Sequence, residues 1–374
     1  MRRGLDPARA DAVARGLAPV ALLFEPVSCG DRDTLALAAR SQGLDCITGD
    51  GWAMIAGSAS ALAGLVRPGF SKLQPPVAQL VGELLQAVVQ PIREWEMARG
   101  TVALERPVVV GILNVTPDSF SDGGRYLEPA DALRHAGQML EAGADMLDIG
   151  AQSTAPGRAG AGTTSPDEQW RRLEPVLAEM VRQFPNVPVS VDTTDHTTGR
   201  RALEAGVWAL NDVSGLRLDS EIGAVCAEHG AGLILVHSRG RVDEMATYRL
   251  AQYDDVAIEV AEELRQSVSV AEGLGVPAER IVVDPGLGFA KRPEHNYALL
   301  RGLAALTSLG FPVMVGPSRK RFLGQVTGGE VDVSDNATAA ACVAAFAQGA
   351  GMFRVHDVAR VREALLVADA VRNR

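Results

Sequence analysis

Hydrophobic and polar positions alternate in blocks along most of this chain. Short apolar runs rich in β-branched residues are typical of strands buried on both faces. Between them, apolar residues recur every three or four positions, as they do on one side of a helix. From residue 108 onward this pattern predicts eight strands, over 108–114, 146–150, 187–192, 209–213, 232–237, 281–284, 312–315 and 352–356.

Helices are predicted after each of these strands. Their expected ranges are 130–142, 166–184, 199–205, 220–228, 254–274, 294–303, 336–348 and 360–371. Strictly alternating strands and helices of this number predict an α/β fold, a (β/α)8 or TIM barrel. A doubly wound open sheet is the alternative. Such a sheet rarely repeats the unit eight times and usually carries a GxGxxG fingerprint after its first strand, which is missing here.

The first hundred residues have a different pattern, which predicts a separate small α/β unit. We expect a strand over 20–24, a helix over 32–41, a hairpin with strands 46–48 and 52–56, and a second helix over 59–66. Apolar residues at helical spacing then predict a long amphipathic helix over 75–99, with a break near Pro91. The sequence therefore predicts two domains, a small N-terminal α/β extension over 1–100 and a barrel over 101–374. Packing or interaction is the simplest role for the extension.

Composition excludes several classes of function. A net charge of -10 argues against a nucleic-acid-binding surface, which would need a basic stripe. The four cysteines lie far apart and never form a CxxC pair, so they indicate a reducing compartment and neither a zinc site nor a disulfide framework. No apolar run is long enough to span a bilayer, and no signal-peptide pattern is present. We therefore expect a cytoplasmic protein without a membrane partner.

Polar residues stand at the ends of all eight predicted strands. In a (β/α)8 barrel these ends share one mouth, where catalytic groups collect. One such residue is commonly a helix cap, but capping does not account for all eight positions. The strand-end groups, in chain order, are Asn114, Asp148 with Thr154, Asp192, Asn211, His237, Asp284, Ser318 with Lys320, and Arg354 with His356.

Three of these side chains suit a flat heterocycle. Asp192, Asn211 and Asp284 supply carboxylate acceptors and an amide, which together match a guanidine-like edge such as that of a pterin or a purine. For Asp192 alone, capping of the following helix is the alternative. His237 either lines the same pocket or only packs near it.

Other strand-end residues suit an anion. Arg354 and His356 are alternate residues of one predicted strand, so their side chains share a face and form a clamp for phosphate or pyrophosphate. Asn114 and Asp122 offer the oxygen ligands that Mg²⁺ uses beside phosphate oxygens. Lys320 is expected to open a helix, where its charge is unfavourable to the helix dipole, and this cost indicates a functional role.

These strand-end motifs resemble those of the dihydropteroate synthase family. The resemblance extends over about 108–374, with every motif in order at the end of its expected strand, and the N-terminal extension is similar to that of some longer bacterial members. The motifs are LNVTPDSFSDGG (113–124), DIGAQSTAPG (148–157), SVDT (190–193), NDV (211–213), DPGLGF (284–289), SRK (318–320) and RVHD (354–357).

The resemblance implies a homodimeric barrel transferase of folate biosynthesis, which is a target of sulfonamides. It joins 6-hydroxymethyl-7,8-dihydropterin pyrophosphate to p-aminobenzoate, and it implies Mg²⁺ as the cofactor. By motif, the implied pterin ligands are Asp192, Asn211, Asp284 and Lys320, and the implied pyrophosphate ligands are Asn114, Arg354 and His356. Lys320, Arg354, His356 and Asn114 would act in catalysis, and Asn114 with Asp122 would hold the metal. The implied residues of the aminobenzoate site and its two loops are Thr154, Ser318, Phe120 and Pro156.

One departure from the family pattern affects the anion site. The second loop of the family usually carries an arginine where this chain has Ala155, and Arg158 follows three positions later. A non-catalytic pterin-binding homologue is therefore one alternative to an active synthase. A corrinoid-dependent methyltransferase that uses methyl-tetrahydrofolate is another, although it would need neither Arg354 nor His356.

Overall fold

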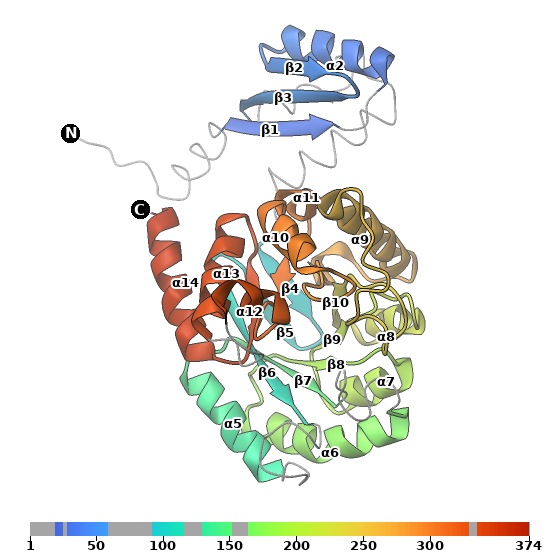
Figure 1. Cartoon of the computed structure of the whole chain (residues 1–374). Coiled ribbons are helices and arrows are strands. Elements are labelled where there is room, and N and C mark those ends of the chain that lie inside the picture. The colour runs from blue at the N-terminus through green and yellow to red at the C-terminus, as the bar shows by residue number, and fades with distance from the viewer. Residues whose placement is uncertain are drawn as a thin grey trace, which may run out of the picture. The chain divides into compact units, whose positions relative to one another are not determined.

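The computed structural model describes residues 19–24, 28–58, 92–115, 129–151, 164–328 and 335–373 (Figure 1). Contacts divide the chain into two compact units, residues 1–91 with 308–310 and residues 92–307 with 311–374. No helix within these described ranges is both long and apolar enough to cross a membrane.

The first unit is a three-stranded antiparallel sheet with one helix. Its elements are β1 (Pro19–Phe24), α2 (Cys29–Ser41), β2 (Asp45–Gly49) and β3 (Trp52–Ser58), and the strand order is β1-β3-β2. The Ser28 side chain caps α2 by accepting a hydrogen bond from the Asp31 backbone, and the helix buries Leu35 against a sheet that buries Ile55. The predicted strand, helix and hairpin are confirmed. The helix predicted over 59–66 lies outside the described residues.

The helix predicted over 75–99 is wrong for its described part. Residues from Ile92 onward form a hairpin of β4 (Glu94–Met97) and β5 (Gly100–Ala103). Glutamates at 94 and 96 alternate with buried Trp95 and Met97, which is the two-residue period of a strand. The indole N–H of Trp95 donates to the Arg280 carbonyl at 2.9 Å, so the hairpin belongs to the second unit and the predicted boundary at residue 100 falls too late.

Eight parallel strands form the second unit, and they close into a barrel. They are β6 (Val108–Asn114), β7 (Met146–Gly150), β8 (Val189–Asp192), β9 (Ala209–Asp212), β10 (Gly232–Val236), β11 (Ile281–Asp284), β12 (Met314–Val315) and β13 (Met352–Val355). Their order in the sheet is β11-β10-β9-β8-β7-β6-β13-β12. A parallel bridge between Val283 and Val313 joins the two ends of this order, which confirms the predicted (β/α)8 barrel.

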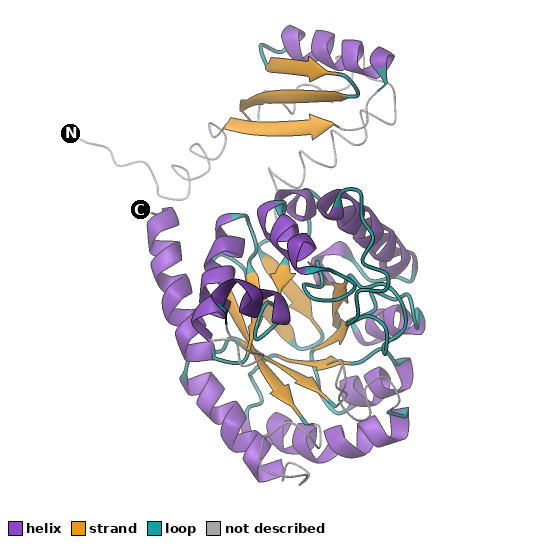
Figure 2. Ribbon diagram, in the orientation of Figure 1, coloured by secondary structure: helices purple, strands orange, loops and turns teal. Residues whose placement is uncertain are grey.

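Helices surround the strands, as Figure 2 shows in purple around orange. They are α5 (Pro129–Glu141), α6 (Pro166–Gln183), α7 (His196–Glu204), α8 (Glu221–His229), α9 (Val256–Gly273), α10 (Pro293–Arg301), α11 (Ala304–Thr307), α12 (Arg321–Thr327), α13 (Asp335–Ala347) and α14 (Val358–Asn373). The pattern predicted eight of them to within a few residues. It did not predict the short helix α11, and for α12 it gave only the start, at Lys320.

Apolar side chains fill the amino-terminal end of the barrel. Trp95, Met97 and Val102 of the hairpin pack in one cluster with the first residues of the strands, such as Val108 and Met146. Because this end is sealed by apolar packing, the polar strand residues collect at the opposite, carboxyl end.

Candidate active site

A buried carboxylate, Asp148 of β7, is the centre of the polar network. Its side chain has no exposed surface, and its two oxygens accept hydrogen bonds from Ser190 Oγ at 2.5 Å, Asn211 Nδ2 at 3.1 Å and Arg354 Nε at 2.6 Å. Such a charge is tolerated in the interior only with partners of this kind. In the sequence, Asp148 stands near a predicted strand end, and no role was predicted for it. The available signal was a charged residue inside the otherwise apolar run Met146–Gly150.

Arg354 lies between two carboxylates. Besides its bond to Asp148, one of its terminal nitrogens contacts Asp192 Oδ2 at 3.2 Å. Burial raises the pKa of Asp192 to about 7, against the opposing attraction of Arg354. The pKa of Asp192 therefore lies near neutral pH, where this carboxyl can gain or lose a proton.

The amide of Asn211 is satisfied on one side only. Its nitrogen donates to Asp148, while Oδ1 is one of three buried side-chain polar atoms without a partner in the part of the chain that the structure describes. A buried orphan acceptor carries a desolvation cost that an N–H donor on a ligand would remove. This atom therefore points to a ligand with hydrogen-bond donors.

Asp284 completes the predicted acceptor set. Its side chain is buried at the end of β11, where Oδ1 accepts from the backbone of Gly286 at 2.7 Å and burial raises its pKa. Asp192, Asp284 and Arg354 all act electrostatically on Lys320, so the predicted residues of three strands converge on one region.

Lys320 reaches back to the loop that follows β11. Its Nζ donates to the carbonyl of Leu287 and lies 4.6 Å from the centre of the Phe289 ring. Burial lowers the pKa of Lys320 to about 8, although Asp284 and Asp192 favour its charged form. Lys320 is the extended N-cap residue of α12 and does not lie within the helix itself.

Ser318 and His356 form a pair just beyond the ends of the neighbouring strands β12 and β13. Ser318 Oγ accepts from the His356 backbone N–H at 3.2 Å and lies 2.9 Å from ring atom Nδ1. Burial lowers the pKa of His356 to about 3, so the ring is neutral at physiological pH. If the serine hydroxyl donates to Nδ1, the ring hydrogen is on Nε2 and serves as a donor for an anion.

Asn114 ends β6 beside the same network. A Cβ built on Gly150 would lie 3.6 Å from Asn114 Oδ1 and 3.8 Å from Asp192 Oδ2, so the glycine separates an amide oxygen from a carboxylate oxygen. These are hard ligands of the kind that Mg²⁺ uses. The other predicted metal ligand, Asp122, and the predicted loop residues Phe120, Thr154 and Pro156 lie outside the described residues.

Another group has a spacing suited to a metal. Asp195, His196 and Asp219 offer ligand atoms within 4.8 Å of one another, the only such His, Cys, Asp and Glu cluster in the described parts of the chain. Asp195 caps α7, and His196 Nδ1 contacts Asp219 at 2.8 Å. The cluster includes none of the strand-end residues above.

His237 packs behind the site. It is buried, and both ring nitrogens are engaged, Nδ1 by Lys291 at 2.8 Å and Nε2 by Glu263 at 3.0 Å. Of the two roles that the sequence left open for His237, the structure favours packing. Lys291 is itself buried and was not among the predicted residues.

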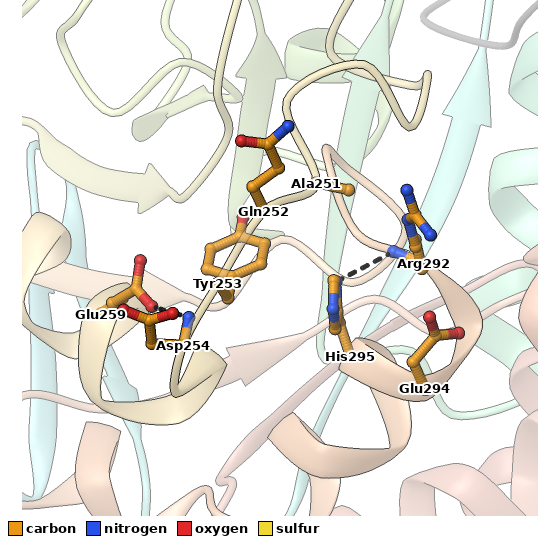
Figure 3. Close-up of a pocket in the computed structure, with 8 residues that line it drawn as sticks. All are labelled: Ala251, Gln252, Tyr253, Asp254, Glu259, Arg292, Glu294 and His295. Atoms are coloured by element: carbon orange, nitrogen blue, oxygen red, sulfur yellow. Dashed lines mark hydrogen bonds between the residues drawn. The ribbon is translucent and has the colours of Figure 1, made fainter.

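A separate cavity of about 500 Å³ lies near the start of α9 and α10 (Figure 3). Its polar lining includes side chains of both charges, and Glu259 accepts there from the Asp254 backbone at 2.6 Å. The lining residues are Ala251, Gln252, Tyr253, Asp254, Glu259, Arg292, Glu294 and His295. None of them was predicted as a site residue.

Known proteins resemble this chain closely. A family model described as "Pterin binding enzyme" matches residues 110–356. The dihydropteroate synthase of Synechocystis sp. is 43% identical over 269 residues, which cover 71% of this chain and 91% of that protein.

Two solved structures are similar in fold as well as sequence. The dihydropteroate synthase of Xanthomonas albilineans in complex with 7,8-dihydropteroate is 37% identical with a TM-score of 0.67, and the match covers 75% of this chain and 99% of that one. The Yersinia pestis enzyme in a sulfonamide drug complex is 34% identical with a TM-score of 0.70, and the match covers 75% of this chain and 100% of that one.

Proposed function

This chain belongs to the family of pterin-binding enzymes that contains the dihydropteroate synthases, and we propose that it is an active transferase of that kind. It condenses 6-hydroxymethyl-7,8-dihydropterin pyrophosphate with p-aminobenzoate. The products are 7,8-dihydropteroate, a precursor of folate, and pyrophosphate.

One observation carries this proposal. Two carboxylates, Asp192 and Asp284, act on Lys320, and Asn211, which donates to Asp148 in the same network, has a buried Oδ1 without a partner. The ring system of a pterin presents N–H donors along one edge and acceptors elsewhere. It would satisfy the orphan oxygen and engage the carboxylates through charge-assisted hydrogen bonds.

The leaving group would meet the positive side of the site. Arg354 and the neutral His356 ring donate hydrogen bonds to pyrophosphate oxygens, and Asn114 lies beside them at the end of β6. The bond between the pterin methylene carbon and the pyrophosphate oxygen breaks first, and the cation left behind is conjugated with the ring. The amine of p-aminobenzoate then forms the new C–N bond and releases a proton. Such a reaction needs stabilisation of the departing anion and exclusion of water, with no strong general base.

Magnesium belongs to the same proposal. Asn114 Oδ1 is a suitable oxygen ligand, and Asp122 is the second ligand that we propose from the sequence. Bound Mg²⁺ would neutralise charge on the pyrophosphate oxygens. The fit of Asn114 and the nearby Asp192 carboxylate supports an oxygen-lined cation site at this point.

Further parts of the proposal concern the second substrate and the assembly. Ser318 and Thr154 would line the aminobenzoate site, with Phe120 and Pro156 on the two loops, and sulfonamides would compete there. A homodimer is proposed as well, and the exposed apolar residues of α14 support it; these are Leu366, Val367 and Val371. All four cysteines are free thiols, which supports a cytoplasmic location.

The test is pyrophosphate release from dihydropterin pyrophosphate at saturating Mg²⁺, with and without p-aminobenzoate. We expect release that depends on the arylamine and is lost in Lys320→Ala and Arg354→Ala. Pterin binding without release would instead identify a non-catalytic pterin-binding homologue, the alternative suggested by Ala155. Transfer of a methyl group from methyl-tetrahydrofolate to a corrinoid would contradict the proposal.

A further inference from the structure

The loop after β11 contributes contacts to Lys320 in addition to the Asp284 carboxylate. The Leu287 carbonyl accepts from Lys320 Nζ, and the Phe289 ring lies under the same amine. The position of Lys320 therefore depends on how firmly residues 284–289 are held.

His237 supports this loop through its backbone. Its N–H donates to the Asp284 carbonyl at 2.9 Å, and a Cβ built on Gly286 would lie only 1.8 Å from the His237 carbonyl oxygen. Gly286 also has a φ of +63°. Only glycine fits this close approach, which fixes the first half of the loop against β10.

Lys291 supports the second half of the loop from behind. Its Nζ lies 2.9 Å from the Phe289 carbonyl and 2.8 Å from His237 Nδ1. Its side chain is buried, with a relative exposure of 1%, so water does not compete for either contact. Lys291 and Lys320 thus hold the same residue, Phe289, one through its carbonyl and the other over its ring.

The donors and acceptors of the hydrogen bonds that link Lys291, His237 and Glu263 can be assigned. The pKa of Glu263 is lowered to about 2, because the hydrogen bonds from His237 and Arg239 outweigh the effect of burial. Its carboxylate can therefore only accept, and His237 Nε2 must carry the hydrogen. Burial lowers the pKa of His237 to about 3, so the ring is neutral and Nδ1 accepts from Lys291. Arg239 anchors Glu263 from the other side.

We propose that Lys291, His237 and Glu263 form a positioning relay that fixes the 284–289 loop and, through it, the catalytic position of Lys320. None of the three touches the reacting atoms. The proposal deepens the proposed function, because the relay acts on the residue assigned to the pterin. It also assigns a role to a buried lysine and a buried histidine that the reaction itself does not use.

Two variants of Lys291 separate hydrogen bonding from packing. Both Lys291→Met and Lys291→Gln remove the amine and are similar in length, but only glutamine retains two N–H donors for Phe289 and His237. Leu264→Ala is the matched control, because it removes buried apolar contacts from α9, the helix of Glu263, without touching the relay. Circular dichroism would confirm that each variant is folded.

Two readouts are needed. Steady-state kinetics should give Lys291→Met a kcat/KM for dihydropterin pyrophosphate at least about tenfold below the wild type, since a misplacement of 1 Å can cost about a hundredfold. The KM for p-aminobenzoate should stay within about twofold, and Lys291→Gln should recover much of the loss. Competitive acetylation of Lys320 across pH, quantified by mass spectrometry, should show a higher titration midpoint in Lys291→Met than in Lys291→Gln, because both variants lose the same amine near Lys320 and only the methionine variant releases Lys320 into better-solvated surroundings.

The labelling readout requires no turnover. A wild-type protein without synthase activity would contradict the proposed function and leave the relay testable through the Lys320 midpoint. Equal Lys320 midpoints in Lys291→Met and Lys291→Gln, or identical kinetics for these two variants, would overturn the relay.

If Lys291→Met fails to fold, Glu263→Leu provides the same test. Leucine has no oxygen to accept from His237 Nε2, so neither the tautomer nor the orientation of the ring is held against Lys291. The Lys320 midpoint should then shift in the same direction, and no shift would overturn the relay.

Discussion

Replacing Asp148 by asparagine should disconnect Arg354 from the centre of the site. The change keeps the shape of the side chain but removes its charge. The amide can still offer one oxygen to Asn211 and Arg354 while its nitrogen faces the Ser190 hydroxyl, which is able to accept. The main loss is therefore the ionic character of the 2.6 Å bond to Arg354. Arg354 would then keep its ion pair with Asp192 and have a neutral hydrogen bond to residue 148.

The magnitude follows from the kind of bond that is lost. A hydrogen bond to a charged group contributes about 1.5–3 kcal/mol, and a neutral one contributes about 0.5–1.5 kcal/mol. The Asp148 side chain is completely buried, so solvent does not screen this difference. Because the charges of both partners are involved, we expect the free energy of unfolding to fall by about 2 kcal/mol. An equal loss in transition-state binding would lower kcat/KM for the pterin substrate about 30-fold.

Asp212→Asn is the matched control. Asp212 is an equally buried strand-end carboxylate, but it accepts hydrogen bonds from the backbone of Ser214 and Leu216 and does not contact Arg354. Urea unfolding followed by circular dichroism should show that both variants are destabilised. Only Asp148→Asn should show the large fall in kcat/KM. Equal kinetic losses in the two variants would refute the idea that Asp148 acts by placing Arg354.

Three more predictions concern pH, the hairpin and the loop after β11. Affinity for dihydropterin pyrophosphate should fall below about pH 7, where Asp192 gains a proton, and above about pH 8, where Lys320 loses one; calorimetric titrations giving a flat profile would contradict this. Trp95→Ala should lower the free energy of unfolding by about 3–5 kcal/mol in urea denaturation, because it empties the amino-terminal end of the barrel, and a loss below about 1 kcal/mol would show that the hairpin is dispensable. Gly286→Ala should abolish activity and displace the Leu287 carbonyl, because its Cβ would lie 1.8 Å from the His237 carbonyl oxygen; wild-type kcat/KM would contradict this.

The local pattern of the sequence determined most of the barrel. Strands such as Val108–Asn114, Met146–Gly150 and Ile281–Asp284 occupy the predicted residues, because a strand buried on both faces must be apolar throughout. The alternation of strands and helices then places every strand end at one mouth. The sequence alone therefore placed Asp148, Asp192, Asp284 and Arg354 at that mouth, but it gave Asp148 no role and did not single out Lys291.

Tertiary structure decided the partners of those residues. The bond between Arg354 and Asp148 joins positions 206 residues apart, and Lys291 meets His237 across 54 residues. Tertiary structure also decided the hairpin of residues 92–103. Trp95 and Met97 alternate as in a strand, but they are buried only because they pack against the amino-terminal end of the closed barrel. Hydrophobic periodicity reports which face of an element is buried. The pairing of buried charges depends on which faces the closed barrel brings together, and therefore only the folded chain determines it.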